Sequence, residues 1–372
     1  MRVFLFVIDG FGIGGDKMAS LFNDEGSNTY ENVKNSVGLS LPFLEKLGLN
    51  NIDGINQQKR DFVHGSYARL EEKTFAKDTT AGHFEMAGIP LKTPYKTYPN
   101  GFPKELVEKI SKESGYNFIA NKVASGTKII NELGDEHLKS KSLILYTSQD
   151  SVMQIAGHTK VLSYTNLYKV CEIARKIMVG ENSVGRVIAR PFDGESGNYY
   201  RTDKRKDFSL PPPSGSMLEK LKENGYDVIG VGKIDDIFSN VGLTESNHTK
   251  DNNQSLNACD ELLNKPFNGL AFINLIDTDM IYGHRNDVEG YKNALENIDF
   301  RLEKISKNIS NDDVIIITGD HGCDPTTEST DHSRENVPLL IYGERIDKNK
   351  NLGIIKGFDF ISKYVLELFN LK

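Results

Sequence analysis

The sequence predicts an α/β fold with a second, smaller α/β unit set within it. Short runs rich in β-branched residues, which are typical of buried strands, alternate with stretches whose apolar residues recur at helical spacing. The sequence changes in character over residues 94–208, and the first pattern of alternating strands and helices resumes afterwards. We therefore expect a unit of ordinary domain size at residues 94–208, with α/β structure on either side of it.

The individual elements follow from these patterns in chain order. Apolar runs predict strands at residues 3–8, 65–70, 143–147, 186–190, 227–231, 270–275, 314–318 and 337–342. Helical spacing, with Pro near a start or Gly at an end, predicts helices at residues 42–48, 79–88, 103–113, 165–178, 216–223, 253–263 and 358–369, and a long helix that includes 291–309.

Composition narrows the class of protein. With 372 residues, 38% hydrophobic and 26% charged, the chain can fill one large core or two ordinary ones. A net charge of -7 argues against general nucleic-acid binding. Cys171, Cys259 and Cys323 are odd in number and scattered, which favours a reducing cytoplasm over a disulfide framework. The first apolar run, residues 3–8, is too short for a signal peptide or a membrane span.

The unit at 94–208 contains polar loops and a basic segment. Loops that follow strands are expected at residues 147–152 and 189–192. The basic segment, residues 200–207, leads to three prolines at 211–213, which form a stiff connector. A charge run is usually a solvated surface, although arginines facing an active site would use the same features to bind a phosphate.

A glycine-rich loop, residues 9–15, follows the first strand and opens with an acid. Its spacing does not fit the dinucleotide-binding fingerprint, and Asp9 stands where a phosphate would need backbone donors. Ligands bind at the carboxyl ends of strands in open α/β sheets, so Asp9 suits a metal ion better. Taken alone, it is about as well explained as a capping or turn residue.

Two later strands deliver acids and imidazoles in the same way. The candidate ligands are Asp9, Asp279, His284, Asp320, His321 and His332. One such pair would indicate no more than a solvated loop, but six nitrogen and oxygen ligands are too many for one tetrahedral site. They suit two adjacent metals, which together hold the entering and leaving oxygens of a phosphoryl transfer. A mixed N/O set fits Mn²⁺, Zn²⁺ or a relative.

A nucleophile is available near residue 79, where a helix is expected to start. A hydroxyl there lies at the positive end of the helix dipole, which favours its alkoxide and an attached phosphate. Thr79 and Thr80 both qualify on sequence grounds. The commoner use of Thr at this position is as an N-cap. The residues together predict metal-assisted phosphoryl transfer through a phosphothreonine.

Seven segments, in order over nearly the whole chain, resemble the phosphopentomutases of the alkaline phosphatase superfamily. They are residues 9–14, 77–85, 146–152, 185–192, 231–234, 279–285 and 320–325, of which the last, Asp-His-Gly-Cys-Asp-Pro, is highly specific. The resemblance implies an alkaline-phosphatase-like core, with a mostly parallel sheet flanked by helices, formed by residues 1–93 and 209–372. It implies a smaller α/β cap domain inserted at residues 94–208.

The resemblance also implies roles for single residues. Thr79, rather than Thr80, would be the phosphorylated nucleophile. One Mn²⁺ would be held by Asp9, Asp320 and His321, and the other by Asp279, His284 and His332, with Zn²⁺ or Mg²⁺ acceptable to the same ligands. Sugar-phosphate contacts would come from Asp150, Arg190, Lys233 and Arg201, with Arg205 as a further phosphate partner. Cys323 is interpreted as a packing residue, and His83 is left undecided.

The implied reaction interconverts α-D-ribose 1-phosphate, or the 2-deoxy sugar, with the 5-phosphate through a bisphosphate that also serves as activator. The cap would exclude water from the phosphoryl group. The nearest alternatives are a cofactor-independent phosphoglycerate mutase or a metal-dependent phosphatase of the same superfamily, and a non-catalytic sugar-phosphate-binding protein. A small sugar phosphate is the expected partner, with no nucleic acid and no membrane. The sequence carries no signal for the oligomeric state, and a monomer is the expectation.

Overall fold

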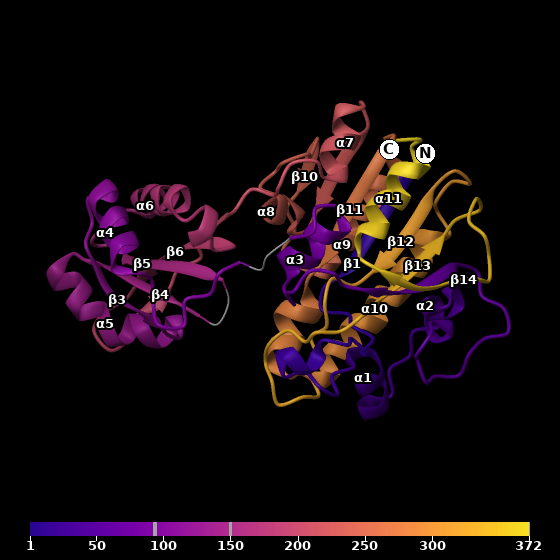
Figure 1. Cartoon of the computed structure of the whole chain (residues 1–372), viewed down its shortest axis with the longest axis horizontal. Coiled ribbons are helices and arrows are strands. Elements are labelled where there is room, and N and C mark those ends of the chain that lie inside the picture. The colour runs from indigo at the N-terminus through magenta and orange to yellow at the C-terminus, as the bar shows by residue number, and fades with distance from the viewer. Residues whose placement is uncertain (92–94, 149–150, 372) are drawn as a thin grey trace. The chain divides into compact units, whose positions relative to one another are not determined.

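The computed structural model describes residues 1–91, 95–148 and 151–371. The chain divides into two compact units. The first unit combines Met1–Pro94 with Pro212–Lys372, and the second is Tyr95–Pro211. Figure 1 shows a long sheet flanked by helices in the first unit, and a smaller sheet with α4, α5 and α6 in the second.

An eight-stranded sheet forms the centre of the first unit. In spatial order its strands are β10 (Glu245–Asn247), β9 (Asp227–Val231), β11 (Gly269–Leu275), β1 (Arg2–Ile8), β12 (Val314–Thr318), β13 (Val337–Tyr342), β2 (Ser66–Glu71) and β14 (Lys350–Lys356). The five strands from β10 to β12 run parallel, β13 is antiparallel to both its neighbours, and β14 is parallel to β2. The central strand β1 is buried from Val3 to Ile8, as expected for a parallel strand covered on both faces.

Helices cover both faces of this sheet. One set packs its apolar residues with those of β1, β11 and β12 in a single core: α1 (Thr29–Val37), α2 (Pro42–Leu47), α9 (Asn252–Asn264) and α10 (Val288–Ser306). A second set contacts β9, β11 or one another: α3 (Thr79–Met86), α7 (Met217–Glu223), α8 (Ile234–Phe238) and α11 (Asp359–Leu368). Short turns of 3₁₀ helix lie at Ala19–Phe22, Leu49–Asn51 and Gly283–Arg285, and Thr278–Tyr282 forms a π-helical turn.

The second unit has its own sheet and core. Its strands run in the order β3 (Phe118–Val123), β4 (Leu143–Thr147), β5 (Val152–His158), β6 (Arg186–Asp193) and β7 (Tyr200–Arg201), and β8 (Lys206–Ser209) also pairs with β6. The helices are α4 (Lys104–Ser114), α5 (Gly126–Ser140) and α6 (Tyr164–Ile177), with a 3₁₀ turn at Gly180–Asn182. The helical-spacing residues predicted near 165–178 are buried in this core.

The expectation of a loop at residues 189–192 is wrong, because β6 continues to Asp193. A proline inside a strand normally costs a ladder hydrogen bond. On the edge of β6 that faces β7 and β8, Pro191 loses no ladder hydrogen bond. The reason is that β8 pairs with β6 only as far as Ala189, and β7 only from Phe192 onward. Parts of the basic segment are likewise strand, as β7 and the start of β8.

Several elements carry no clear sequence signal and were not predicted, among them α1, α5, β3, β5 and β14. In α5 the cause is visible, because Gly126 and Gly134 lower the helix propensity of the segment. Both glycines lie against other side chains. A Cβ at Gly134 would lie 2.4 Å from the ring of Tyr199, and one at Gly126 would overlap the guanidinium of Arg201.

Candidate active site

Three neighbouring parallel strands bring the predicted ligands to one edge of the sheet. Asp9 directly follows β1, which lies between β11 and β12. Asp320 comes two residues after β12, and Asp279 lies in the π-helical turn that follows β11. Because these strands share a direction, their carboxyl ends meet where open α/β sheets bind ligands. π-turns are also frequent at functional sites.

Asp9, Asp320 and His321 form a buried cluster, which we call the inner group. Their ligand atoms lie within 4.8 Å of one another. His321 Nε2 is 3.3 Å from Asp9 Oδ1 and 3.5 Å from Asp320 Oδ2. The backbone N–H of Gly10 donates to Asp320 Oδ1 at 3.1 Å. Gly10 has φ +79°, and a Cβ there would lie 2.9 Å from the Cβ of Cys323, so only glycine fits this turn.

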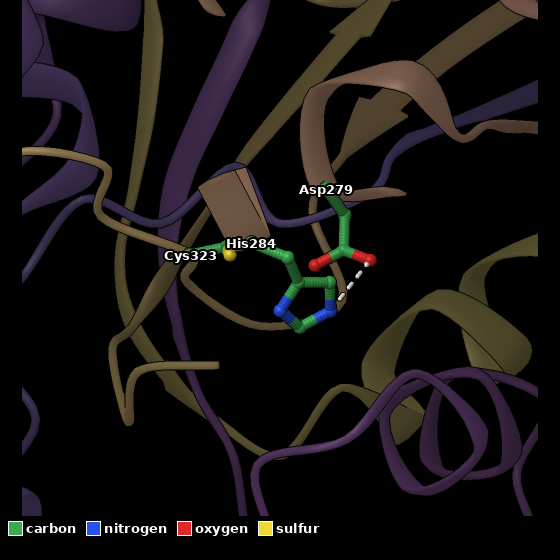
Figure 2. A group of neighbouring side chains, drawn as sticks. All are labelled: Asp279, His284 and Cys323. Carbon is green, nitrogen blue, oxygen red and sulfur yellow. Dashed lines mark ion pairs between the residues drawn. The ribbon is translucent and has the colours of Figure 1, made fainter. Parts of the chain in front are cut away.

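We call Asp279, His284 and His332 the outer group. Asp279 lies near both imidazoles, but the sets whose ligand atoms all lie within 4.8 Å of one another are Asp279 with His284 and Cys323, and Asp279 with His321 and His332. His284 Nε2 lies 3.4 Å from Asp279 Oδ2, and His332 Nε2 lies 3.3 Å from Asp279 Oδ1. Figure 2 shows the imidazole of His284 directed at the Asp279 carboxylate. His284 Nδ1 donates to the carbonyl of Thr330 at 2.7 Å, which leaves Nε2 free to act as a ligand.

The two groups adjoin each other through their imidazoles. The ring centroids of His321 and His332 are 4.0 Å apart. The Cys323 thiol is buried and within ligand distance of Asp279 and His284 (Figure 2). Burial raises the pKa of this thiol well above its ordinary range, with further support from Asp279, so it is a neutral thiol. A packing role for Cys323 therefore stays a prediction.

The carboxylates and imidazoles of both groups shift one another's pKa values. Burial and the neighbouring Asp320 raise the pKa of Asp9. Burial opposes ionisation of Asp320 and Asp279, but nearby imidazoles, His321 and His332 respectively, hold the pKa of each below its ordinary value. Burial would lower the pKa of His321, yet Asp320 and Asp9 raise it well above the ordinary value. The raised pKa of His321 reflects the negative charge of the buried carboxylates around it, which cations would also balance.

The unpaired atoms of the two groups fit divalent cations. Within the described ranges, Asp320 Oδ2, Asp279 Oδ1 and His332 Nε2 are buried and lack a well-aligned hydrogen bond. Buried polar atoms normally have well-aligned partners, so poorly satisfied carboxylate and imidazole atoms that lie together leave room for a bound positive ion. Carboxylate oxygens with imidazole nitrogens suit Mn²⁺, Zn²⁺ or a related ion. The side chains of the two groups therefore fit divalent cations.

The hydroxyl of Thr79 reaches the inner group. Thr79 is the first residue of α3, and Asp78 caps this helix by accepting from the N–H of Ala81 at 3.1 Å. Thr79 Oγ1 lies 3.1 Å from His321 Nε2 and 3.4 Å from Asp9 Oδ1. Since Asp78 serves as the N-cap, the Thr79 hydroxyl is not needed for capping and can take part in chemistry.

The predicted substrate contacts divide between the two units. In the second unit, Arg190 Nε donates to Gln154 at 3.0 Å, and an Arg201 amino group donates to the Tyr146 hydroxyl at 3.3 Å. Burial, followed by the nearby Arg205 and Arg201, lowers the pKa of Arg190 to about 10, which shows that the three cations are neighbours. Arg205 also pairs with Asp207 at 2.6 Å.

Lys233 belongs to the first unit. It lies two residues after the end of β9 and precedes the first turn of α8, where its charge acts on Asp277. The fourth predicted contact, Asp150, lies outside the described residues. The structure thus brings the six candidate ligands and Thr79 together in the first unit, and gathers the predicted arginines in the second.

Sequence reasoning missed Asn274 and Arg334. Asn274 is fully buried in β11 and donates to Asp9 Oδ2 at 3.1 Å. Its signal was a lone amide inside an apolar run, since a buried polar group needs a partner. Arg334 is also fully buried, and its guanidinium donates to the Glu72 carboxylate and to backbone carbonyls of Glu72, Thr74 and Ala76. These hydrogen bonds hold residues 72–76, which lead to α3, in place.

Comparison with known proteins agrees with this geometry. The model of the Metalloenzyme superfamily matches residues 1–372. In fold, the chain is similar to the PH0037 protein of Pyrococcus horikoshii, with a TM-score of 0.51 and 16% identity over 99% of this chain and 96% of that one. The chain thus belongs to the metalloenzyme superfamily, and its core has the mostly parallel sheet flanked by helices that was predicted.

Closer relatives identify the family within that class. The phosphopentomutase of Dictyoglomus thermophilum is 51% identical over 373 residues, covering 100% of this chain and 95% of its own. That of Acetivibrio thermocellus is 50% identical over 366 residues, covering 98% and 94% respectively. The chain belongs to the phosphopentomutase family, as predicted, and it is an isomerase of the phosphomutase type.

Among the described residues, no helix has the length and apolar character needed to cross a bilayer.

Proposed function

We propose that this enzyme interconverts α-D-ribose 1-phosphate, or the 2-deoxy sugar, with the corresponding 5-phosphate through a phosphorylated Thr79. The observation that carries the proposal is the Thr79 hydroxyl, which lies at a helix N-terminus within 3.4 Å of both Asp9 and His321. The N-terminal end of α3 favours negative charge on this oxygen and on an attached phosphate. The relatives' names support a pentose phosphate as substrate.

The reaction consists of two balanced transfers. In the first, the P–O bond to Thr79 Oγ1 breaks and a P–O bond forms to the free hydroxyl of the sugar monophosphate. The proton lost by the sugar hydroxyl balances the one gained by the Thr79 oxygen. The resulting bisphosphate reverses its orientation in the site, and the second transfer returns its other phosphate to Thr79.

The inner and outer groups have distinct roles in this scheme. Asp9, Asp320 and His321 would hold one divalent cation beside Thr79, and the outer group would hold the other. Mn²⁺ is the proposed ion for both, with a sugar bisphosphate as the activator that phosphorylates Thr79. Bound cations would supply Lewis acidity, neutralising phosphoryl oxygens and favouring the alkoxide of Thr79.

We assign the sugar phosphate contacts to Arg190, Arg201, Lys233 and Asp150. Arginines offer paired donors in a planar fork that matches phosphate geometry, and two of the four residues supply this group. Residues 94–208 would act as a cap and residues 1–93 and 209–372 as the catalytic core. We also propose a monomer in the cytoplasm, where a reducing environment would preserve the three unpaired cysteines.

³¹P NMR of the full chain with Mn²⁺, ribose 5-phosphate and a catalytic amount of a sugar bisphosphate tests this function. A new signal from ribose 1-phosphate without free phosphate is the expected result. Free phosphate alone would identify a phosphatase, and turnover of phosphoglycerate instead of the pentose would identify the other mutase. No change with either substrate would indicate a binding protein.

Substitution of the nucleophile sharpens the test. Thr79→Ala is expected to abolish transfer and to remove the phosphorylated form seen by mass spectrometry, while the fold survives. Thr80→Ala is the matched control, because it removes the neighbouring hydroxyl on the same helix. Retained mutase turnover in Thr79→Ala would overturn the assignment.

A further inference from the structure

His83 makes contacts that a histidine of the core would not need. It is fully buried in α3, one turn after Thr79. Its Nδ1 lies 2.8 Å from the carbonyl oxygen of Thr79. A carbonyl only accepts, so Nδ1 carries the hydrogen. The same nitrogen lies 3.2 Å from Asp320 Oδ2, a second and less well aligned acceptor.

The opposite edge of the ring reaches the second carboxylate of the inner group. With the hydrogen on Nδ1, Nε2 is an acceptor, and it lies 3.4 Å from the amide nitrogen of Asn274. That amide nitrogen also donates to Asp9 Oδ2 at 3.1 Å. The ring of His83 stacks on Phe272, with centroids 5.7 Å apart and planes 21° apart, which restricts its rotation. A continuous polar chain therefore joins Asp9, Asn274, His83 and Asp320.

We propose that His83 and Asn274 are positioning residues that hold Thr79 and the carboxylates of the inner group in one geometry. The proposal rests on the function proposed above. His83 attaches the first turn of α3 to Asp320, and Asn274 orients Asp9 toward the same point. Hydrogen bonds from partners outside the coordination shell orient metal ligands, and their loss typically costs about 10–100-fold in metal affinity.

His137 provides a matched control. It is also fully buried, its Nδ1 donates to a backbone carbonyl, that of Ser142 at 2.6 Å, and its Nε2 accepts from the backbone N–H of His158 at 2.9 Å. His137 thus matches His83 in burial and tautomer, and like His83 it donates from Nδ1 to a backbone carbonyl. The difference lies in the partners, since those of His137 are backbone groups within the second unit and those of His83 lead to two candidate metal ligands.

The test is a calorimetric titration of the metal-free full chain with Mn²⁺. In His83→Asn the side-chain amide nitrogen stands where Nδ1 was, so the donor to Thr79 and Asp320 is kept. In His83→Gln the amide is moved one methylene further, to the place of Nε2, and this donor is lost. We expect His83→Gln to weaken one of two Mn²⁺ sites by about 10–100-fold. His83→Asn is expected to stay within a few-fold of the wild type, and His137→Gln to lower Tm without changing either site.

Turnover provides a second readout that a purely structural role would not produce. His83→Gln should lower kcat with little change in KM, because misplacement of Thr79 affects transfer and not the capture of the sugar phosphate. A folded His83→Gln variant that binds both Mn²⁺ ions with wild-type affinity would overturn the proposal. A wild-type chain that binds no pair of Mn²⁺ ions would instead overturn the two-metal function.

Asn274→Ala keeps the proposal testable if the His83 variants do not fold. It removes the donor to Asp9 without altering α3. We expect the same Mn²⁺ site to weaken by about 10-fold or more, the lower end of the range for such partners. Wild-type affinity at both sites in this variant would contradict the positioning role.

Discussion

The inner and outer groups use the same residue types in different surroundings. In the inner group the Asp9, Asp320 and His321 side chains are at most 2% exposed. In the outer group the His284 side chain is 35% exposed and that of His332 is 14% exposed. The inner acids lie within two residues of the end of a strand, whereas both outer imidazoles lie in turns and loops. The inner group is therefore wholly buried, whereas the outer group joins a buried carboxylate to imidazoles that reach solvent.

The two groups also differ in how firmly the surrounding structure holds their side chains. Asp320 accepts from the backbone N–H groups of Gly10 and His321, and Asp9 accepts from Asn274, so the inner ligands are held before any cation arrives. Sites of this kind are preorganised by their supporting contacts. His284 has a single backbone acceptor on its other nitrogen, so the outer group is better suited to exchange ligands with solvent or substrate.

The largest expected effect comes from replacing one ligand in each group. Asp320→Asn should weaken the inner Mn²⁺ by more than about 100-fold, the upper range for loss of a mere supporting partner. It also removes one of the two carboxylates that face the buried His321, the other being that of Asp9. His284→Ala should weaken only the outer Mn²⁺, and by less, because water can replace a half-exposed imidazole.

Titration with Mn²⁺ monitored by electron paramagnetic resonance measures both occupancies. The comparison is sharpened if each variant loses one site and keeps the other. Equal losses at both sites in both variants would show that the two groups form a single coupled centre.

A smaller effect is expected from the close packing of α3 on the inner group. Gly82→Ala would place a Cβ 2.3 Å from the carbonyl oxygen of Asp320, so the helix or the ligand must shift. Overpacking of this kind costs about 1–3 kcal/mol, and Tm should fall accordingly. Weaker binding of the inner Mn²⁺ should accompany the loss. An unchanged Tm and wild-type Mn²⁺ affinity would show that the inner group is as adaptable as the outer one.

The smallest effect concerns a buried acid outside both groups. Burial raises the pKa of Asp299 to about 6, although it accepts from the N–H groups of Phe43 and Leu44 at the start of α2. Its folded pKa exceeds the unfolded value, so this stability is fully present below about pH 4 and is lost as the pH rises through about 6. The free energy of unfolding should fall by at most about 1.4 kcal/mol per pH unit in that window.

Chemical denaturation of the metal-free chain at several pH values measures this dependence. Asp299→Asn should flatten the fall, whereas Asp312→Asn, whose carboxylate is largely exposed, should leave it unchanged. Equal pH dependence in wild type and Asp299→Asn would show that this acid titrates normally. Because the chain is metal-free in this experiment, it measures the stability of the first unit separately from metal binding at the inner and outer groups.

Local patterns in the sequence determined the strands and the residues that end them. The β-branched runs before Asp9 and Asp320 are recognisable because strand propensity and burial on both faces act over a few residues. The family resemblance added the choice of Thr79 over Thr80 and the division of six ligands into two sets. These inferences needed no knowledge of which strands are neighbours.

Only the tertiary structure decided which side chains meet. β1 pairs with β11 and β12, which follow it by more than two hundred residues, and this pairing places Asn274 against Asp9. The length of β6 depended on its pairing with β5, β7 and β8, so the predicted strand ended at residue 190 and a loop was expected at residues 189–192. Strand order and side-chain partners arise from contacts between distant segments, which local propensity does not encode.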